Sequence, residues 1–309
     1  MIRGTKILIV ILASIFMSVI LISIAGAKGA GSSSGITLTQ PVSAKSAGIA
    51  EAYTAISGDV VSLHYNPSGL LWLEGKEVSF MYQSGFNEDN FTSIIYGMNL
   101  GSTVLGTSIL YYDTGDIEVY DSDGALVDNT GQRDMVLTVG GAREVYGFPL
   151  GASIKVISSE VFGEKAIAFA LDLGAQYRGL IENLDLGFAV QNLGTELKYV
   201  DRGDPLPLTI RPGALYKMDI RGNPLGISLD LPYYLEEEEM LALLGIGYTY
   251  MNLITIRSGY RLNLRDASGE DESFNIGVGF TWKSYSLDYA MGITQDLSIP
   301  HRVSLRKRF

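Results

Sequence analysis

The segment Phe274-Asn275-Ile276-Gly277-Val278-Gly279-Phe280-Thr281-Trp282 alternates large apolar residues with small or polar ones. Successive residues of a β-strand point to opposite faces, so one face of this segment is apolar and the other is small and polar. The same alternation recurs over residues 167–177, 184–191, 254–264 and 285–293. It predicts strands with one face in an apolar environment, which a soluble sandwich and a membrane barrel both provide.

The number of such segments and the lengths of their connections favour the barrel. Most segments have about ten residues, the length that a tilted strand needs to cross a bilayer core. Tight and long connections alternate, and the long ones carry most of the 34 acidic residues. Short turns at one end and long loops at the other are typical of outer-membrane barrels. We therefore predict an all-β fold, a transmembrane antiparallel β-barrel of about 14 strands over residues 75–309, with strands near 75–84, 90–99, 103–112, 133–144, 149–160, 165–178, 184–193, 208–219, 224–232, 241–250, 253–263, 272–282, 284–293 and 301–309.

Composition excludes several other classes. The chain has 309 residues, a net charge of −11 and no cysteine. Its acidic balance argues against a nucleic-acid partner, which requires a basic surface. Without cysteine there is no disulfide framework, zinc finger, thiol catalysis or N-terminal lipid attachment. With 18% charged residues and a mean hydropathy of +0.19, the chain is apolar for a soluble protein of this length.

The first 27 residues have the features of a signal peptide. Arg3 and Lys6 precede an unbroken apolar run over residues 7–24, and Ala25-Gly26-Ala27 follows as a small-residue cleavage site. The alternative is an uncleaved anchor. In either case the rest of the chain leaves the cytoplasm. We expect it in the cell outer membrane, in contact with membrane lipid, with the acidic loops extracellular and both termini periplasmic.

Residues 28–74 differ in texture from the strand region. They are rich in Ala, Gly and Ser and lack clean alternation. We expect a short helix over residues 47–55 and a turn at Asn66-Pro67-Ser68-Gly69, because proline and glycine favour turn dihedrals. The apolar and aromatic residues of this segment predict an N-terminal plug folded into the barrel, and a loose periplasmic tail is the alternative.

The sequence holds little that points to catalysis. The two histidines are His64, beside the 66–69 turn, and His301, near Ser304. A Ser–His pair in such a barrel would suggest a phospholipase, but a histidine at the membrane interface is the better explanation of His301. Asp121-Ser122-Asp123-Gly124 with Asp128 resembles a calcium loop but lacks its closing Glu. We expect no enzymatic activity, no metal site and no cofactor.

Charged residues of both signs fall on the predicted lumen face. Charges inside a barrel require water or partners. Arg257, Arg261 and Arg302 are candidates to bind a ligand, and structural ion pairing within the lumen is the alternative. The full set comprises Arg257, Arg261, Arg302, Arg306 and Arg308, with Asp172, Asp185 and Asp288.

Two stretches carry a resemblance to a known family. The run from Pro41 to Ala55, followed by His64 to Leu70, resembles the N-terminal signature of the PorV/PorQ family of FadL-like outer-membrane barrels. The signature positions here are Gly48, Glu51, Tyr53, Asn66, Pro67 and Gly69, while Ala50 and Ser68 replace a glycine and an alanine of the usual form. Residues 115–124 resemble that family's third-strand hairpin. The ending, residues 301–309, resembles a signal read by the barrel-assembly machinery through the terminal aromatic Phe309, although Lys307 interrupts its apolar face.

The resemblance implies a fourteen-stranded barrel with an N-terminal plug and leaves three functions open. FadL relatives pass fatty acids or hydrocarbons, which leave sideways through a gap in the wall. PorV-type members instead serve type IX secretion and accept cargo proteins at the cell surface. We predict binding or transport of a hydrophobic small molecule, with the secretion accessory as the first alternative and a structural outer-membrane protein, whose acidic loops bind divalent ions, as the second. A cargo dock requires exposed apolar residues on the long loops, and the candidates are Tyr199, Leu206, Leu208, Tyr233, Tyr234 and Leu235.

Overall fold

Fourteen antiparallel strands close into a barrel in the computed structural model, which describes residues 33–85, 89–115, 117–120, 126–265, 272–294 and 299–309. The first strand pairs with the last, so the sheet has no free edge along its length. The predicted all-β barrel of about 14 strands is confirmed. The barrel strands are β1 (Lys76–Ser84), β2 (Asn90–Asn99), β3 (Thr103–Asp113), β6 (Gln132–Val145), β7 (Phe148–Val161), β8 (Glu164–Ile181), β9 (Leu184–Gly194), β12 (Thr209–Ile220), β13 (Asn223–Asp230), β15 (Glu239–Tyr250), β16 (Ile254–Asn263), β17 (Ser273–Trp282), β18 (Tyr285–Thr294) and β19 (His301–Arg308).

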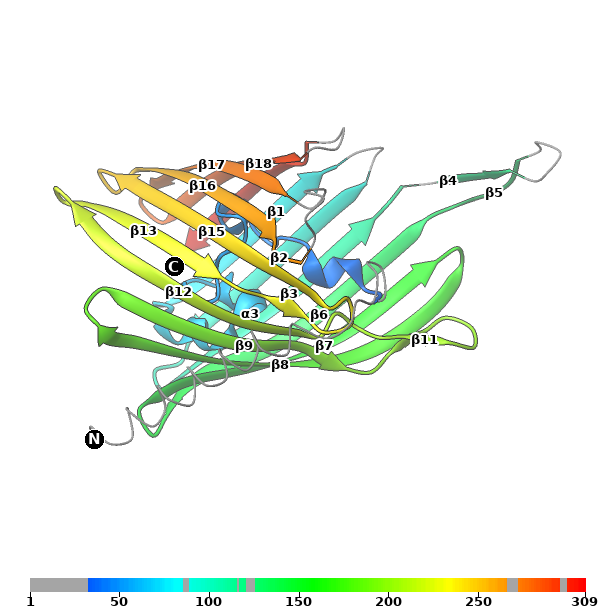
Figure 1. Ribbon diagram of the computed structural model, residues 1–309, viewed down its shortest axis with the longest axis horizontal. Helices are drawn as coiled ribbons and strands as arrows, with labels where there is room; N and C mark the ends of the chain where they lie inside the picture. The colour runs from blue at the N-terminus through cyan, green and yellow to red at the C-terminus, as the bar shows by residue number, and fades with distance from the viewer. Residues whose placement is uncertain (1–32, 86–88, 116, 121–125, 266–271, 295–298) are drawn as a thin grey trace.

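Shorter strands belong to the long loops at one end of the barrel. β4 (Ile117–Tyr120) and β5 (Leu126–Thr130) form a hairpin that projects beyond the barrel, as Figure 1 shows. β10 (Leu197–Lys198) pairs with β11 (Gly203–Asp204). β14 (Tyr233–Tyr234) lies between β12 and β15 and continues the sheet beyond the end of β13. The predicted signal peptide, residues 1–27, and the calcium-like residues 121–124 lie outside the described residues.

The tight connections at the other end are hairpin turns with left-handed backbone. Tyr146 and Gly147 have φ angles of 51° and 83°, and Arg221 and Gly222 have 55° and 83°. Two consecutive positive φ values match the twist of the flanking strands, which is why glycine or asparagine is common in two-residue hairpins. These turns lie at the predicted ends of the strands, so local sequence chemistry already specified the strand boundaries there.

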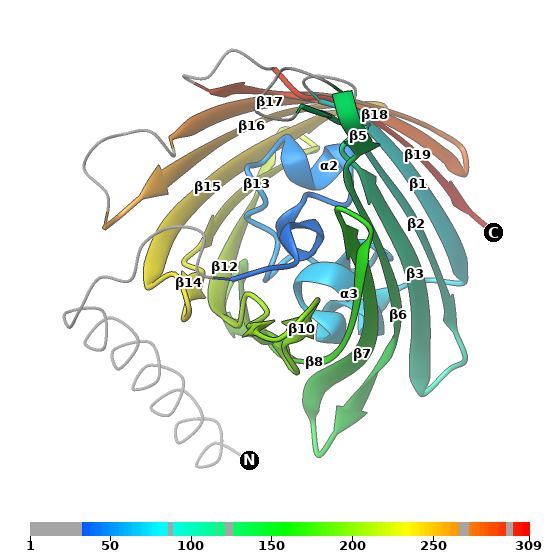
Figure 2. The same cartoon turned by 90° about the vertical axis from the view of Figure 1, so that its right-hand side faces the viewer.

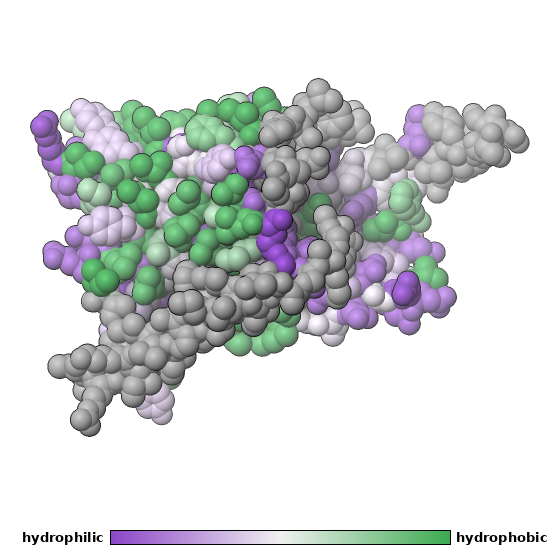
Figure 3. Space-filling view, viewed as in Figure 1, coloured by the Kyte–Doolittle hydropathy of each residue, from purple (hydrophilic) through white to green (hydrophobic). Residues whose placement is uncertain are grey.

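The outer surface of the barrel is apolar. In β17, Phe274, Val278 and Trp282 are 44–57% exposed, whereas Asn275 on the opposite face is buried. The space-filling view shows this surface as a green band between purple ends (Figure 3). Such a band is the surface that a transmembrane barrel presents to lipid. Among the described residues no helix has the length and apolarity to cross a membrane.

Residues 33–74, called the interior segment from here on, lie inside the barrel (Figure 2). The segment contains two 3₁₀ helices, η1 (Ile36–Thr39) and η2 (Pro67–Trp72), and two single-turn α-helices, α2 (Ala44–Ala47) and α3 (Ser62–Tyr65). The helix predicted over residues 47–55 is wrong. α2 ends at Ala47, and Ala50 and Glu51 adopt φ angles of 50° and 62°, which turn the chain back instead of continuing the helix.

Candidate functional site

Glycines on the inner face of the wall allow the backbone of the interior segment to approach closely. A Cβ atom on Gly187 of β9 would lie 2.2 Å from the carbonyl oxygen of Thr54. One on Gly259 of β16 would lie 2.3 Å from the backbone nitrogen of Ala50. Gly48 of the predicted signature meets Gly277 of β17 in the same way, because a Cβ on either residue would lie 3.2 Å from the Cα of the other. The small inward face predicted from the sequence is therefore the surface on which the interior segment packs.

A buried cluster around Asp230 of β13 fixes the Glu51–Thr54 stretch to the wall. One carboxylate oxygen of Asp230 accepts hydrogen bonds from the backbone nitrogens of Tyr53 and Thr54, both at 2.9 Å, and from the Thr54 hydroxyl at 2.6 Å. The same oxygen accepts from Nε of Arg211 in β12 at 3.0 Å. Arg211 also donates to the carbonyl oxygen of Glu51. We call these five residues the Asp230 cluster.

Glu51 and Tyr53 of the predicted signature have further partners inside the barrel. The Glu51 carboxylate accepts a hydrogen bond from the Tyr65 hydroxyl at 2.9 Å. The Tyr53 hydroxyl donates to Asp59 at 2.7 Å, and Lys45 and Arg306 contact the same carboxylate oxygen at 2.6 and 3.2 Å. Burial opposes ionisation of Asp59, but Lys45 and Arg306 outweigh it and hold the pKa of this carboxyl below its usual range. Asp59 therefore stays charged at neutral pH.

The predicted turn at Asn66-Pro67-Ser68-Gly69 begins η2 and contacts β8 of the wall. The Asn66 side chain accepts hydrogen bonds from the backbone nitrogen and hydroxyl of Ser68, which caps the 3₁₀ helix. Its amide nitrogen donates to the carbonyl oxygens of Thr54 and Ala175 at 2.9 and 3.1 Å. Asn66 thus joins two parts of the interior segment to β8. Gly69 has no room for a side chain, because a Cβ there would lie 2.8 Å from that of Ser62.

Two of the three candidate ligand arginines are engaged by neighbouring side chains of the wall. Arg257 in β16 forms an ion pair with Asp288 of β18 at 2.7 Å. Arg302 in β19 donates to the Gln83 side chain of β1 at 2.6 Å. Arg261 differs, because its Nε is buried without a hydrogen-bond partner among the described residues. All three side chains lie on the inner face as expected, and their role in ligand binding stays a prediction.

The sequence analysis did not identify several charged residues that face the lumen. Arg211, Asp230 and Asp59 were not singled out, although Arg211 lies within a predicted strand, two residues before Gly213 on the same inner face. Lys155 of β7 was also missed, and it pairs with Asp172 of β8 at 2.8 Å. The alternation rule that placed Asp172 on the inner face could also have identified Lys155, because alternation along β7 places Lys155 on the inner face as well.

An apolar strip of the lumen faces the interior segment from the other side. On β1, β2, β3, β6 and β7 the buried inward residues are Met81, Phe91, Ile95, Val104, Leu110, Val136 and Ile157. They form one cluster with the interior-segment residues Leu38, Val42, Val60, Val61, Leu63, Leu70 and Leu73. Leu197 and Leu206 of the long-loop end belong to the same cluster. This cluster is called the apolar seam.

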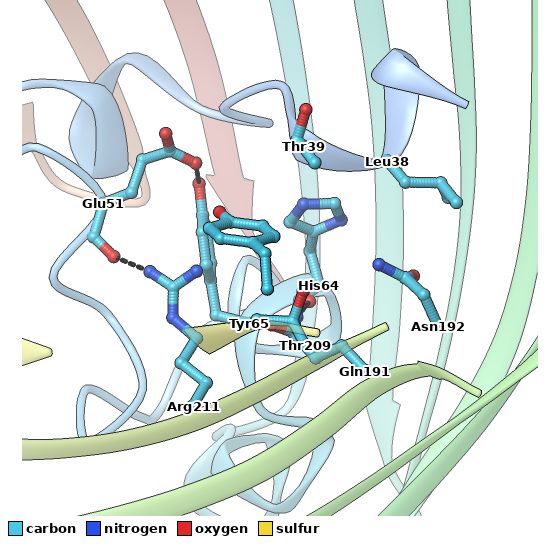
Figure 4. A pocket seen from close by; sticks show the side chains of 10 residues that line it. Leu38, Thr39, Glu51, His64, Tyr65, Gln191, Asn192, Thr209 and Arg211 are labelled. Carbon is cyan, nitrogen blue, oxygen red and sulfur yellow. Dashed lines mark hydrogen bonds between the residues drawn. The ribbon is translucent and has the colours of Figure 1, made fainter. Parts of the chain in front are cut away.

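A small polar hollow lies between the interior segment and strands β9 and β12 (Figure 4). It has room for about one water molecule. His64 points into it, and burial, with Lys155 and Arg211 nearby, holds the pKa of His64 well below its ordinary value, so the imidazole is neutral. The lining residues are Leu38, Thr39, Glu51, His64, Tyr65, Gln191, Asn192, Thr209, Arg211 and Tyr234.

The structure does not bring together His301 and Ser304, the Ser–His pair considered in the sequence analysis. His301 is exposed on the outer face, where its Nδ1 lies 2.7 Å from the Tyr289 hydroxyl. Ser304 is buried on the inner face, where its Oγ accepts a hydrogen bond from the backbone nitrogen of Ala44. The barrel wall separates the two side chains. No group of three or more His, Asp or Glu side chains suited to a metal ion occurs within the described part of the chain.

Two solved structures of hydrocarbon channels share this fold. The CymD monoaromatic hydrocarbon channel aligns with 87% of this chain and 97% of its own, at a TM-score of 0.64 and 14% identity. A deletion mutant of the TodX monoaromatic hydrocarbon channel aligns with 85% of this chain and 98% of its own, at a TM-score of 0.59 and 13% identity. The class is therefore a closed β-barrel with the fold of these outer-membrane channels.

Sequence comparison adds one curated relative. A UPF0164 protein of Treponema pallidum (strain Nichols) is 23% identical over 175 residues, which are 52% of this chain and 44% of the relative. The chain thus covers less than half of that protein's length. No family model matches the chain.

Proposed function

We propose that this protein is an outer-membrane transporter of the FadL-like group, and that it passes a hydrophobic small molecule of the fatty-acid or hydrocarbon class. The observation that carries the proposal is the apolar seam inside the lumen. The interior of an open porin is polar and filled with water, so a buried apolar strip along one side of a lumen favours an apolar cargo. The names of the two channels with the same fold agree with this class of cargo.

The distribution of charge inside the lumen supports a partial opening. The Asp230 cluster and the Arg306–Asp59 pair fix the interior segment to β12, β13 and β19. The other side of the segment packs against β1–β7 through the apolar seam and makes hydrogen bonds to Glu77, Ser93, Asn99 and Asp134 of these strands, but it forms no ion pair with them among the described residues. Breaking a buried ion pair leaves unpaired charges, whereas Asp134 and Glu77 keep their partners within the wall, Ser159 and Arg308, when the segment moves away. A hydrophobic ligand would therefore pass between the interior segment and the apolar wall.

The location and orientation belong to the same proposal. We place the long acidic loops at the cell surface and the short turns and both termini in the periplasm. Leu197 and Leu206 would then lie where a ligand enters, because they join the seam from the long-loop end. The secretion-accessory alternative needs exposed apolar residues on these loops, but Leu206 and Tyr233 are 4% and 6% exposed. Their burial favours a function inside the lumen.

An engineered disulfide across the seam tests the proposal. A Cβ atom on Gly97 of β2 would lie 2.8 Å from Cγ1 of Val60 in the interior segment, close to the distance of about 3 Å between the Cβ of one cysteine and the sulfur of the other in a disulfide. The chain has no cysteine, so V60C/G97C forms a single defined crosslink. Uptake of labelled oleate and toluene is measured in Gram-negative cells that lack their own transporter for these compounds. Oxidation is expected to stop uptake, and a reducing agent is expected to restore it.

The controls separate closure of the seam from damage to the fold. The single variants V60C and G97C carry the same steric changes and should not respond to oxidation. Equal uptake by oxidised and reduced V60C/G97C, with the crosslink verified by mass, would refute passage along the seam.

Arg261, near the long-loop end of β16 and outside the apolar seam, is the candidate to hold the polar end of such a ligand as it enters. Its Nε is buried and unpaired among the described residues, whereas Arg257 and Arg302 already have partners. A charged donor that faces the lumen suits the carboxylate of a fatty acid. Native mass spectrometry of the protein extracted gently from its membrane should retain a mass of a few hundred daltons, and Arg261→Ala should lose it. Retention of the same ligand by this variant would remove Arg261 from the proposal.

A further inference from the structure

Lys307 breaks the apolar face of the last strand, and the structure shows where it lies. Lys307 points to the outer face of the barrel, as do Val303 and Leu305 before it and Phe309 after it. Its direct cross-strand neighbour is Tyr285 of β18, and Tyr285 in turn pairs with Trp282 across the short β17–β18 turn. These side chains share the outer face at the short-turn end of the barrel. The lysine therefore belongs to the lipid-facing surface, where an apolar residue is the norm.

The lysines in this region lie against aromatic rings. The Lys307 ammonium nitrogen is 4.5 Å from the ring centre of Phe309 and 5.2 Å from that of Tyr285. The Lys283 ammonium nitrogen is 4.6 Å from the ring centre of Trp282. A ring face holds a lysine head in place while leaving part of the ammonium free to bind an anion. Trp282, Tyr285 and Phe309 are 45–66% exposed, so the cations lie on an open surface.

A third lysine completes the group. Lys76, the first residue of β1, is exposed, and its backbone exchanges hydrogen bonds with that of Phe309. It is two residues from Val78, the direct neighbour of Lys307, and so lies diagonal to Lys307 on the same face. We call Lys76, Trp282, Lys283, Tyr285, Lys307 and Phe309 the lysine–aromatic patch.

Within the described part of the chain, neither Lys283 nor Lys307 forms an ion pair with a carboxylate. The acidic residue nearest in register, Glu77, has inward parity, is buried and is engaged by Arg308 at 2.6 Å. Like charges placed close together on a surface repel each other unless a counter-ion joins them. Lys283 and Lys307 therefore have no carboxylate partner among the described residues, and the place of the patch at the margin of the apolar band puts it at the depth of lipid headgroups.

We propose that the lysine–aromatic patch binds the phosphate headgroup of an anionic phospholipid, with the acyl chains lying along the apolar outer faces of β17–β19. The headgroup phosphate would contact Lys283 and Lys307 together, and Trp282 and Tyr285 would pack against the glycerol region. Anionic lipid is chosen over zwitterionic lipid because Lys283 and Lys307 carry ammonium groups that have no carboxylate partner among the described residues. The proposal does not depend on what the lumen transports.

The chain contains its own reporter of this site. It has two tryptophans, Trp72 in the interior segment and Trp282 in the patch. Trp72→Phe leaves Trp282 as the single tryptophan, which is excited selectively over the tyrosines at about 295 nm or above. The protein is reconstituted in vesicles that contain increasing fractions of dibrominated phosphatidylglycerol or dibrominated phosphatidylcholine. Bromine quenches tryptophan on contact, so the two quenching curves give the relative affinity of the two lipids for the patch.

We expect phosphatidylglycerol to be preferred by about fivefold for each contributing lysine, the effect of one cation near an anionic membrane surface. K283Q/K307Q in the same background should reduce the preference to about fivefold or less, because only Lys76 of the patch lysines remains. K165Q is the matched control, because Lys165 in β8 is an exposed lysine near the long-loop end, with a side chain 72% exposed. Native mass spectrometry of the same three proteins should show one strongly retained phosphatidylglycerol in all but K283Q/K307Q. Equal quenching by the two lipids in the parent protein, or an unchanged preference in K283Q/K307Q, would overturn the proposal.

Discussion

Replacement of Arg211 by methionine should loosen the interior segment without dismantling the barrel. Arg211 is 5% exposed and Asp230 is fully buried, and the two form an ion pair at 3.0 Å. Removing one partner of a buried pair costs about 3–5 kcal/mol, because the other charge stays in a medium that solvates it poorly. Asp230 would keep three neutral donors from Tyr53 and Thr54. We therefore expect a loss near the lower figure, about 3 kcal/mol.

The two tryptophans allow this loss to be assigned to the interior segment. Denaturant unfolding in lipid vesicles is followed through Trp72 in a Trp282→Phe background, and through Trp282 in a Trp72→Phe background. Arg211→Met should move the Trp72 transition to lower denaturant and shift the Trp282 transition less. Arg211→Met combined with Asp230→Asn should recover part of the loss, with a coupling free energy of at least about 1 kcal/mol.

A surface pair provides the comparison for Arg211→Met. Lys165→Met removes the exposed Lys165–Glu160 contact, which is 3.5 Å long, and should change stability by less than about 1 kcal/mol. If Arg211→Met shifts the Trp72 transition no more than Lys165→Met does, the Asp230 cluster does not hold the interior segment and the reasoning fails.

Two further predictions concern packing and pH. Gly187→Ala places a Cβ 2.2 Å from the Thr54 carbonyl oxygen and should destabilise the interior segment by about 1–3 kcal/mol. Gly226→Ala is the control and should be close to neutral, because a Cβ there would lie 3.4 Å from its nearest atom. Unfolding followed through Trp72 compares the stability of the two variants. Because the pKa of His64 is lowered in the folded state, the unfolded chain binds the proton first as the pH falls below about 6.5. Stability carried by neutral His64 is thus complete at pH 8 and decreases towards pH 5. The free energy of unfolding is measured from pH 5 to pH 8. His64→Gln should make it depend less on pH, whereas the control His301→Gln should show the same dependence as the parent protein. A larger effect of His301→Gln than of His64→Gln would contradict the role given to His64.

The barrel itself was accessible to sequence reasoning because its determinants are local. A strand that separates lipid from a filled lumen must alternate, and β17 does so through Phe274, Asn275 and Ile276. Tight turns need residues that tolerate positive φ, so their positions mark the strand ends. The prediction of a helix over residues 47–55 was wrong because local composition does not determine the structure there. Its Ala-rich composition favours a helix, but the hydrogen bonds of the 51–54 backbone to Asp230 and Arg211 require a turn at Ala50 and Glu51.

Sequence alone therefore determined the fold class, the strand boundaries and the faces of the strands, because each depends on residues a few positions apart. Only the tertiary structure decided which inward residues meet. Thr54 and Asp230 are 176 positions apart, and Arg306 and Asp59 are 247 apart. Closure of the barrel and the path of the interior segment bring them within hydrogen-bond distance, and no local pattern encodes those two properties. The alternation of β19 likewise identified Lys307 as an exception, but the rings that hold its side chain come from the register between strands.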